Sequence, residues 1–208
     1  MDLLAELRLR RALCIVRAPS IPDPVGITRA LVDAKLPIVE FAFTTPDAPR
    51  LIERASRVDG VTVGAGTVLS VQQARDAISA GARFLLTPGI QLSVAEEATR
   101  QGVPVVLGAM TPTEVATAVT AGSVAVKVFP AARLGSGYVR DLLGPYPDAA
   151  LVVSGGIHAG NAAEYLAAGA IAATAGSGVV SPELAAGSRF AEIRLRAAEF
   201  VAAVRKEQ

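Results

Sequence analysis

Hydrophobic residues gather in eight short runs along the chain, with longer amphipathic segments between them. The runs cover residues 12–17, 37–43, 61–66, 83–88, 103–109, 124–129, 150–156 and 171–177. Each run is continuously apolar rather than alternating, which is typical of parallel strands that are covered on both faces. The pattern therefore predicts eight buried β-strands.

The segments between the runs carry the start and stop signals of helices. Residues that cap helix N-termini stand at three expected starts, namely Ser70, Thr111 and Asn161. An Ala-Gly pair closes three segments at Gly81, Gly122 and Gly169, where glycine can take the left-handed conformation that ends a helix. Each strand is therefore expected to be followed by a helix.

Eight strand–helix units in 208 residues favour a compact (β/α)8 TIM barrel. An open doubly wound sheet is the alternative, but eight is the number of units that closes, and no GxGxxG follows the first strand. Residues 1–11 predict a short helix ahead of the barrel, and their mixed charges do not fit a signal peptide. No shift in composition marks a boundary, so one domain over residues 1–208 is expected.

The overall charge and composition narrow the range of partners. The formal net charge is +1, charged residues make up 19% of the chain, and aromatic residues make up 4% with no tryptophan. This gives neither a field that attracts nucleic acid or a membrane nor a platform that stacks bases. No apolar run reaches the length of about 20 residues that spans a bilayer. A cytoplasmic enzyme or binding protein for small molecules is expected.

Cysteine and histidine are too rare for several kinds of site. Cys14 is alone, so a disulfide framework and a cysteine metal cluster are excluded, and its apolar surroundings predict a core residue. His158 is the one histidine, which excludes a multi-histidine zinc site and makes a Ser-His-Asp triad improbable. We expect no metal and no cofactor.

Lys127 interrupts the sixth apolar run, between Val126 and Val128. Lysine and arginine together number 20, and three of them are lysines, so this chain places lysine sparingly. One interpretation is a paired lysine, or one whose ammonium reaches solvent. The other is an amine that forms a Schiff base with a carbonyl substrate, because burial near a cation such as Arg17 favours the neutral, nucleophilic form. Arginine could not perform this chemistry.

Glu40 interrupts the second apolar run in the same way. Burying a carboxylate costs about 1–3 kcal/mol or more of folding free energy unless the group is neutralised or paired. One interpretation is a structural ion pair with Lys127 or Arg17. The other is a general acid–base group that moves protons for the lysine chemistry, since burial raises the pKa of a carboxyl towards neutrality.

Further polar residues follow the strands, at the end of a barrel where active sites form. Arg17, Thr67 and Thr87 belong to this set, and Thr67 could bind a substrate carboxylate or cap the next helix. The last two strands end in glycine-rich stretches containing Ser154, Gly155, Gly156, Gly176 and Ser177. Backbone N–H groups of such loops bind phosphate, although glycines there could also serve tight turns alone.

Several stretches together resemble the class I aldolases that act on 2-keto-3-deoxy-6-phosphogluconate (KDPG), on its galactonate analogue and on 4-hydroxy-2-oxoglutarate (KHG). The matching stretches, in the order of the family, are VEFAF around Glu40, VGAGTVLS at 63–70, LTPGI at 86–90, VKVFPA around Lys127, GPYPD at 144–148, SGGI at 154–157 and GS at 176–177. They span nearly the whole chain. The resemblance implies a homotrimeric (β/α)8 barrel that needs no metal.

The resemblance also implies roles for individual residues. Lys127 is similar to the Schiff-base lysine and Glu40 to the general acid–base residue, while Arg17 and Thr67 fall where contacts to the pyruvate carboxylate are expected. Pro88 and Phe129 are similar to residues that line the pocket. The phosphate cradle corresponds to Gly155, Gly156, Gly176 and Ser177.

The chain departs from the pattern at Thr44, where some members carry an arginine that helps to hold the substrate. Arg17 could supply that cation. The expected reaction is cleavage of KDPG into pyruvate and glyceraldehyde 3-phosphate, with the galactonate analogue or KHG as alternative substrates. An isomerase or epimerase for phosphorylated sugars that uses Glu40 as a base, and a non-catalytic binding protein, remain the competing hypotheses.

Overall fold

The computed structural model describes residues 2–205 and forms a closed barrel of eight parallel strands in sequential order. Lys206 lies outside the described residues. The strands are β1 (Ala12–Val16), β2 (Ile38–Ala42), β3 (Thr62–Gly66), β4 (Leu85–Leu86), β5 (Val105–Ala109), β6 (Ala125–Val128), β7 (Leu151–Val153) and β8 (Ala172–Ala175). The prediction of a (β/α)8 TIM barrel is confirmed, and the open sheet is excluded.

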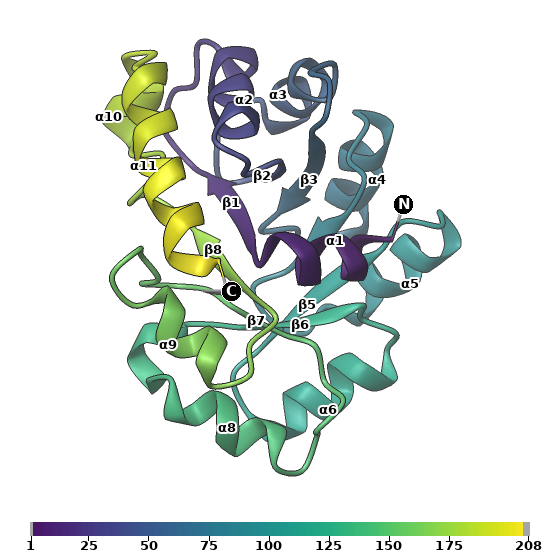
Figure 1. The fold of residues 1–208 in the computed structure, drawn as a ribbon. Coiled ribbons are helices and arrows are strands. Elements are labelled where there is room, and N and C mark those ends of the chain that lie inside the picture. The colour runs from purple at the N-terminus through teal and green to yellow at the C-terminus, as the bar shows by residue number, and fades with distance from the viewer. Residues whose placement is uncertain (1, 206–208) are drawn as a thin grey trace.

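Helices surround the barrel and connect its strands (Figure 1). They are α1 (Leu3–Arg10), α2 (Pro24–Asp33), α3 (Ala48–Ala55), α4 (Val71–Ser79), α5 (Leu92–Arg100), α6 (Pro112–Thr120), α7 (Ala131–Leu134), α8 (Gly137–Leu143), α9 (Ala162–Ala167), α10 (Pro182–Ala186) and α11 (Phe190–Val204). None of these helices is long and apolar enough to cross a membrane.

Most helix boundaries follow the capping signals. The Ser70 side chain accepts a hydrogen bond from Gln73 N–H at the start of α4, and Thr111 forms a capping box with Glu114 at the start of α6. Gly81, Gly122 and Gly169 all have positive φ angles, as the Ala-Gly pairs predicted. These local signals fix where each helix joins the following strand.

Asn161 precedes α9 but does not cap it through its side chain. Its Oδ1 accepts a hydrogen bond from His158 N–H at 2.9 Å, and its Nδ2 donates to Gly156 O at 3.0 Å. Asn161 stands at the N-cap position of α9, as the sequence predicted, but its side chain makes no capping hydrogen bond because the preceding loop engages it. Asn161 instead braces the glycine-rich loop after β7.

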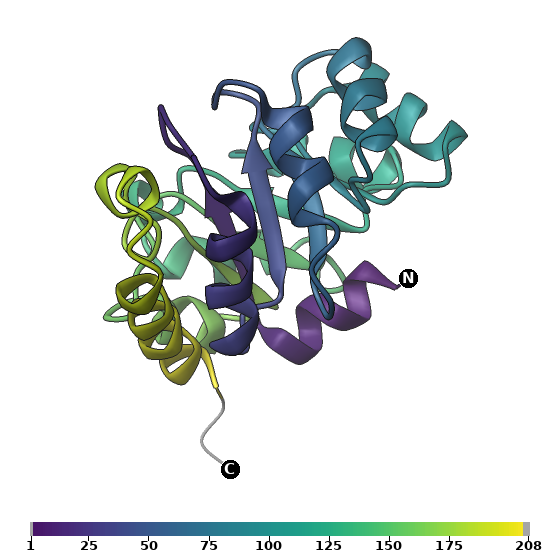
Figure 2. The same ribbon diagram turned by 90° about the horizontal axis from the view of Figure 1, so that it is seen from above.

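The barrel has two separate apolar cores. Large side chains on the outward faces of the strands pack against the surrounding helices. A second cluster fills the barrel interior and includes Leu13, Ile38 and Phe84 together with Leu3 and Leu7 of α1. Helix α1 therefore closes the N-terminal end of the barrel, and Figure 2 shows it crossing below the strands. Chemistry is left to the opposite end.

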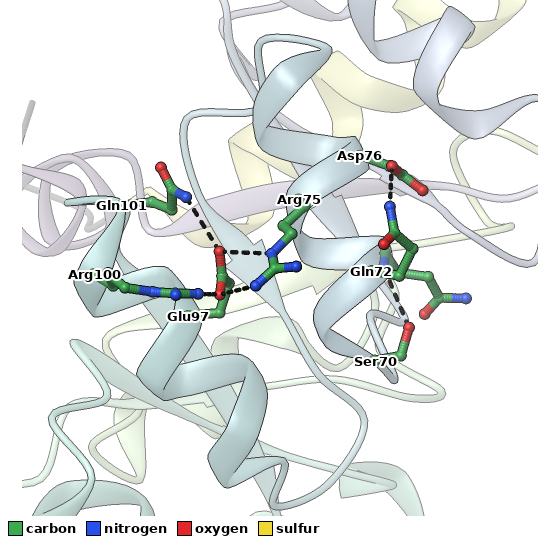
Figure 3. A network of polar contacts seen from close by, with 8 residues as sticks. Ser70, Gln72, Arg75, Asp76, Glu97, Arg100 and Gln101 are labelled. Carbon is green, nitrogen blue, oxygen red and sulfur yellow. Dashed lines mark hydrogen bonds and ion pairs between the residues drawn. The ribbon is translucent and has the colours of Figure 1, made fainter.

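A buried carboxylate joins two helices of the outer layer (Figure 3). Glu97 of α5 is nearly inaccessible, and Arg75 of α4 donates to it from Nε at 3.2 Å and from Nη2 at 3.3 Å. Arg100 contacts the same carboxylate, and Gln101 donates to it at 3.1 Å. Because the charge is paired and hydrogen-bonded, Glu97 has a structural explanation.

Replacing Leu7 by alanine should destabilise the barrel, because Leu7 is 1% exposed within the interior core. We expect the free energy of unfolding to fall by about 2–5 kcal/mol. The matched control is Leu9→Ala on the same helix, where Leu9 is 69% exposed and a change within about 0.5 kcal/mol is expected. Urea titrations of both variants test this. Equal losses would mean that α1 does not plug the barrel.

Candidate active site

A cavity of about 870 Å³ opens at the C-terminal end of the strands, where a TIM barrel carries its site. Eleven of the twelve site residues predicted from the sequence line it, namely Arg17, Thr44, Thr67, Pro88, Lys127, Phe129, Ser154, Gly155, Gly156, Gly176 and Ser177. Residues far apart in the sequence thus meet at one place. The exception is Glu40, which is buried beside the cavity rather than on its wall.

Lys127 projects from β6 into the barrel. Its backbone is paired with Gly108 on β5 and Val152 on β7, and its side chain is 3% exposed. The ammonium lies 5.5 Å from the centre of the Phe129 ring, close enough for a cation–π contact. Within residues 2–205, no carboxylate lies within ion-pair distance of this amine. The interpretation of Lys127 as a lysine held in a structural ion pair therefore has no support in the described part of the chain.

Glu40 lies on β2, on the opposite side of the barrel from β6, and is fully buried. Gly66 makes room for it, since a Cβ at that position would collide with the Glu40 carboxyl. Neither carboxyl oxygen has a hydrogen-bond partner among the described residues. Burial raises the pKa of Glu40, while the positive charges of Lys127 and Arg17 oppose this shift. An unsatisfied buried acceptor of this kind calls for a partner that the described chain does not supply.

Arg17 and Thr67 meet on the cavity wall. The Arg17 Nη2 donates a hydrogen bond to Thr67 Oγ1 at 2.9 Å, joining the loops after β1 and β3. Thr67 has a left-handed backbone with φ of 53°, and α4 is capped by Ser70. The alternative that Thr67 caps the following helix is therefore wrong. The pair places a cation and a hydroxyl together on the cavity wall, a combination suited to binding an anionic group.

The loop after β7 requires both of its glycines. Gly155 and Gly156 have φ angles of 88° and 76°, which strain other residues. A Cβ at Gly155 would lie 2.9 Å from the Phe129 ring, and one at Gly156 would lie 2.5 Å from the Ala132 side chain. These glycines serve a tight turn, and the turn places both residues on the cavity wall.

Two threonines near the cavity differ in what their hydroxyls do. Thr87 is occupied, because its Oγ1 donates to Gly89 O at 2.6 Å and accepts from Gly108 N–H at 3.1 Å. Thr174 on β8 lines the cavity and is 3% exposed, yet the sequence analysis missed it. Strand alternation would have found it, since it lies two residues before Gly176 and faces the same way.

The cysteine and the histidine considered in the sequence analysis lie outside the cavity lining. Cys14 is a buried core residue as predicted, and burial together with the nearby charge of Glu40 raises the pKa of its thiol. His158 is exposed and accepts a hydrogen bond from Gly160 N–H at 3.1 Å. Among residues 2–205, no three His, Cys, Asp or Glu side chains are grouped so that they could hold a metal ion.

Comparisons with known proteins identify the family of the chain. The family model "KDPG and KHG aldolase" matches residues 3–195. A 2-dehydro-3-deoxy-phosphogluconate aldolase of Treponema pallidum is 36% identical over 186 residues, covering 88% of each chain. A 2-dehydro-3-deoxy-6-phosphogalactonate aldolase of Escherichia coli is 31% identical over 199 residues, covering 93% of this chain and 94% of its own.

A solved structure gives the same result in three dimensions. The 2-keto-3-deoxy-6-phospho-gluconate aldolase of Zymomonas mobilis superimposes with a TM-score of 0.88 at 27% identity, covering 97% of each chain. The match extends over the whole barrel rather than over one motif. The chain therefore belongs to the family of KDPG and KHG aldolases, which are lyases that cleave a carbon–carbon bond.

Proposed function

We propose that this protein is a class I aldolase that cleaves KDPG into pyruvate and glyceraldehyde 3-phosphate through an imine on Lys127. The observation that carries the proposal is a lysine amine and a carboxyl on two almost fully buried residues that form no ion pair with each other. An amine without an ion-pair partner among residues 2–205 lies near a carboxyl whose oxygens have no hydrogen-bond partner there. Such charges are destabilising unless a substrate uses them.

Lys127 supplies the electron sink. Its neutral amine attacks the C2 carbonyl of the substrate to give a carbinolamine, which loses water to form a protonated imine. When the C4 hydroxyl loses its proton, the C3–C4 bond breaks and its electron pair moves through C3 to the imine nitrogen. Glyceraldehyde 3-phosphate leaves, and the remaining enamine takes a proton at C3. Hydrolysis then releases pyruvate and restores the amine.

Glu40 moves the protons in these steps. A carboxyl of raised pKa exchanges a proton near neutral pH more readily than an exposed glutamate, which is almost fully ionised there. Its oxygens are sealed from solvent and have no hydrogen-bond partner among residues 2–205, so they remain free to take the proton of the C4 hydroxyl once a substrate is held on Lys127. The same carboxyl can return that proton to C3 of the enamine, so a single acid–base residue suffices.

The two ends of the substrate are held by different chemistry. Arg17 and Thr67 form a cation–hydroxyl pair suited to the C1 carboxylate. The loops with Ser154, Gly155 and Gly156 and with Gly176 and Ser177 offer backbone N–H groups and hydroxyls for the phosphate. Pro88 and Phe129 give the pocket apolar walls, and exposed Thr44 lines its rim. The galactonate analogue and KHG are the alternative substrates.

The substitution Lys127→Arg separates an aldolase from an isomerase or epimerase. Arginine keeps the positive charge but cannot form an imine, so pyruvate release from KDPG should fall by at least about 10³-fold. A lactate dehydrogenase-coupled assay measures it. Lys35→Arg, at an exposed position, is the matched control and should retain full activity. Substantial turnover by Lys127→Arg would favour a non-covalent mechanism with Glu40 as the base.

Glu40→Gln should abolish turnover yet stabilise the fold at neutral pH. Because the folded-state pKa of Glu40 is raised, its contribution to stability is greatest below the ordinary value and is lost as pH rises towards the folded value. The variant should gain about 1–3 kcal/mol over the wild type at neutral pH. Urea titrations between about pH 4 and pH 8 measure the difference, which should widen as pH rises.

Glu114→Gln serves as the control of opposite sign. Hydrogen bonds from Met110 N–H, Thr111 N–H and the Thr111 hydroxyl lower the pKa of Glu114. Its stabilisation is therefore present above the ordinary glutamate value and lost as pH falls through the folded value. This variant should be less stable than the wild type at neutral pH, with the difference vanishing in acid. The same pH trend in both variants would contradict the assignment for Glu40.

Turnover should be unaffected by EDTA, because the protonated imine accepts the electrons that a metal would otherwise stabilise. Activity measured before and after chelation tests this expectation, and a loss restored by a divalent cation would contradict it. Homotrimeric assembly stays a prediction of the family resemblance, and a cytoplasmic location stays a prediction from the composition of the chain. Light scattering coupled to size exclusion measures the first.

A further inference from the structure

The hydroxyl of Thr174 is an unused polar group inside the cavity. Thr174 is 3% exposed, and no hydrogen bond involves its Oγ1 within residues 2–205. Among the described residues, the two Glu40 oxygens are the side-chain atoms that are both sealed from solvent and without a hydrogen-bond partner. Because Thr174 Oγ1 has no partner and is not one of these atoms, it must be accessible to solvent. The oxygen therefore faces the cavity, where it is free to contact a ligand.

The strand register gives Thr174 a defined neighbour. Val153 on β7 pairs with Ala173 on β8, so the next positions, Ser154 and Thr174, stand side by side and face inward. Both side chains are almost fully buried. Ser154 is followed directly by Gly155, and Thr174 is followed two residues later by Gly176. Thr174 thus lies in the barrel wall immediately below the loops assigned to phosphate.

The charged side chains of the cavity are all assigned to the C1 and C2 end of the substrate. Arg17 and Lys127 are the charged side chains on its wall in the described part of the chain. The first is assigned to the C1 carboxylate, and the second forms the imine at C2. The C4 hydroxyl must give its proton to Glu40. What remains between the imine and the phosphate is the hydroxyl at C5, and a threonine hydroxyl can both donate to an alcohol and accept from it.

We propose that Thr174 is a specificity-determining residue that hydrogen-bonds the C5 hydroxyl of the substrate, selecting a polyhydroxylated sugar acid phosphate over a substrate without that hydroxyl. The inference rests on the proposed function and extends it to a residue outside the assigned set. KHG carries a second carboxylate at C5, and no cavity side chain in residues 2–205 remains to neutralise it.

The condensation reaction isolates this single hydroxyl. The C2 hydroxyl of glyceraldehyde 3-phosphate becomes the C5 hydroxyl of the product, whereas 3-oxopropyl phosphate lacks it. The rate of condensation with pyruvate is compared for both aldehydes in the wild type and in Thr174→Val, which keeps the side-chain shape. The preference of the wild type for glyceraldehyde 3-phosphate should fall about tenfold in the variant, as expected for one lost hydrogen bond.

Two further variants control the result. Thr174→Ser retains the hydroxyl and should keep the preference within about twofold of the wild type. Thr28→Val removes a buried hydroxyl that donates to Pro24 O at 2.7 Å in α2, and Thr28 is not part of the cavity lining. It should lower the melting temperature without changing the preference. Comparing the ratio of two aldehydes within each variant removes differences in intrinsic reactivity and in the amount of folded enzyme.

A separate readout distinguishes failure of this inference from failure of the proposed function. Deuterium exchange at the methyl group of pyruvate reports the imine and enamine on Lys127 and involves no C5 hydroxyl. We expect equal exchange in the wild type and in Thr174→Val. Normal exchange with an unchanged aldehyde preference in Thr174→Val would overturn the role of Thr174. Absence of exchange in the wild type would overturn the imine mechanism itself.

Discussion

Everything in this site depends on burying a carboxyl next to an amine without joining them in a closed ion pair. Glu40 is fully buried with free oxygens, and Lys127 is 3% exposed with its ammonium over Phe129. A tight salt bridge would stabilise both charges but remove the nucleophile and the base together. The observed arrangement keeps each group reactive, and the surrounding barrel must offset the unfavourable burial.

The barrel can do this because its stability is supplied elsewhere. Apolar side chains fill the interior below the site, α1 closes that end with Leu3 and Leu7, and a second core joins the strands to the outer helices. Glycines then leave space for side chains of the site, as Gly66 does for the Glu40 carboxyl and Gly155 does for the Phe129 ring. Rigid packing therefore holds the functional groups at the C-terminal end of the strands.

The sequence predicted the strands and most of the residues that line the cavity because both follow from local signals. Continuous apolar runs marked all eight strands, and charged residues within them, such as Lys127 and Glu40, stood out at once. Contacts across the barrel could not be predicted from local signals. The use of Asn161 as a loop brace depends on Gly156 and His158, and the free hydroxyl of Thr174 depends on which neighbouring groups fail to reach it. The burial of Glu40 behind the cavity wall, rather than on its surface, likewise depends on tertiary packing.

Covalent trapping of pyruvate tests the central claim most directly. The protein is treated with pyruvate and borohydride, digested, and mapped by mass spectrometry. The account predicts a stable pyruvyl adduct on Lys127, with Lys35 as an exposed internal control that remains unmodified. An adduct absent under conditions that trap a known class I aldolase, or one found equally on Lys35, would contradict an imine at the barrel centre. Lys127 would then be a core lysine without a covalent role.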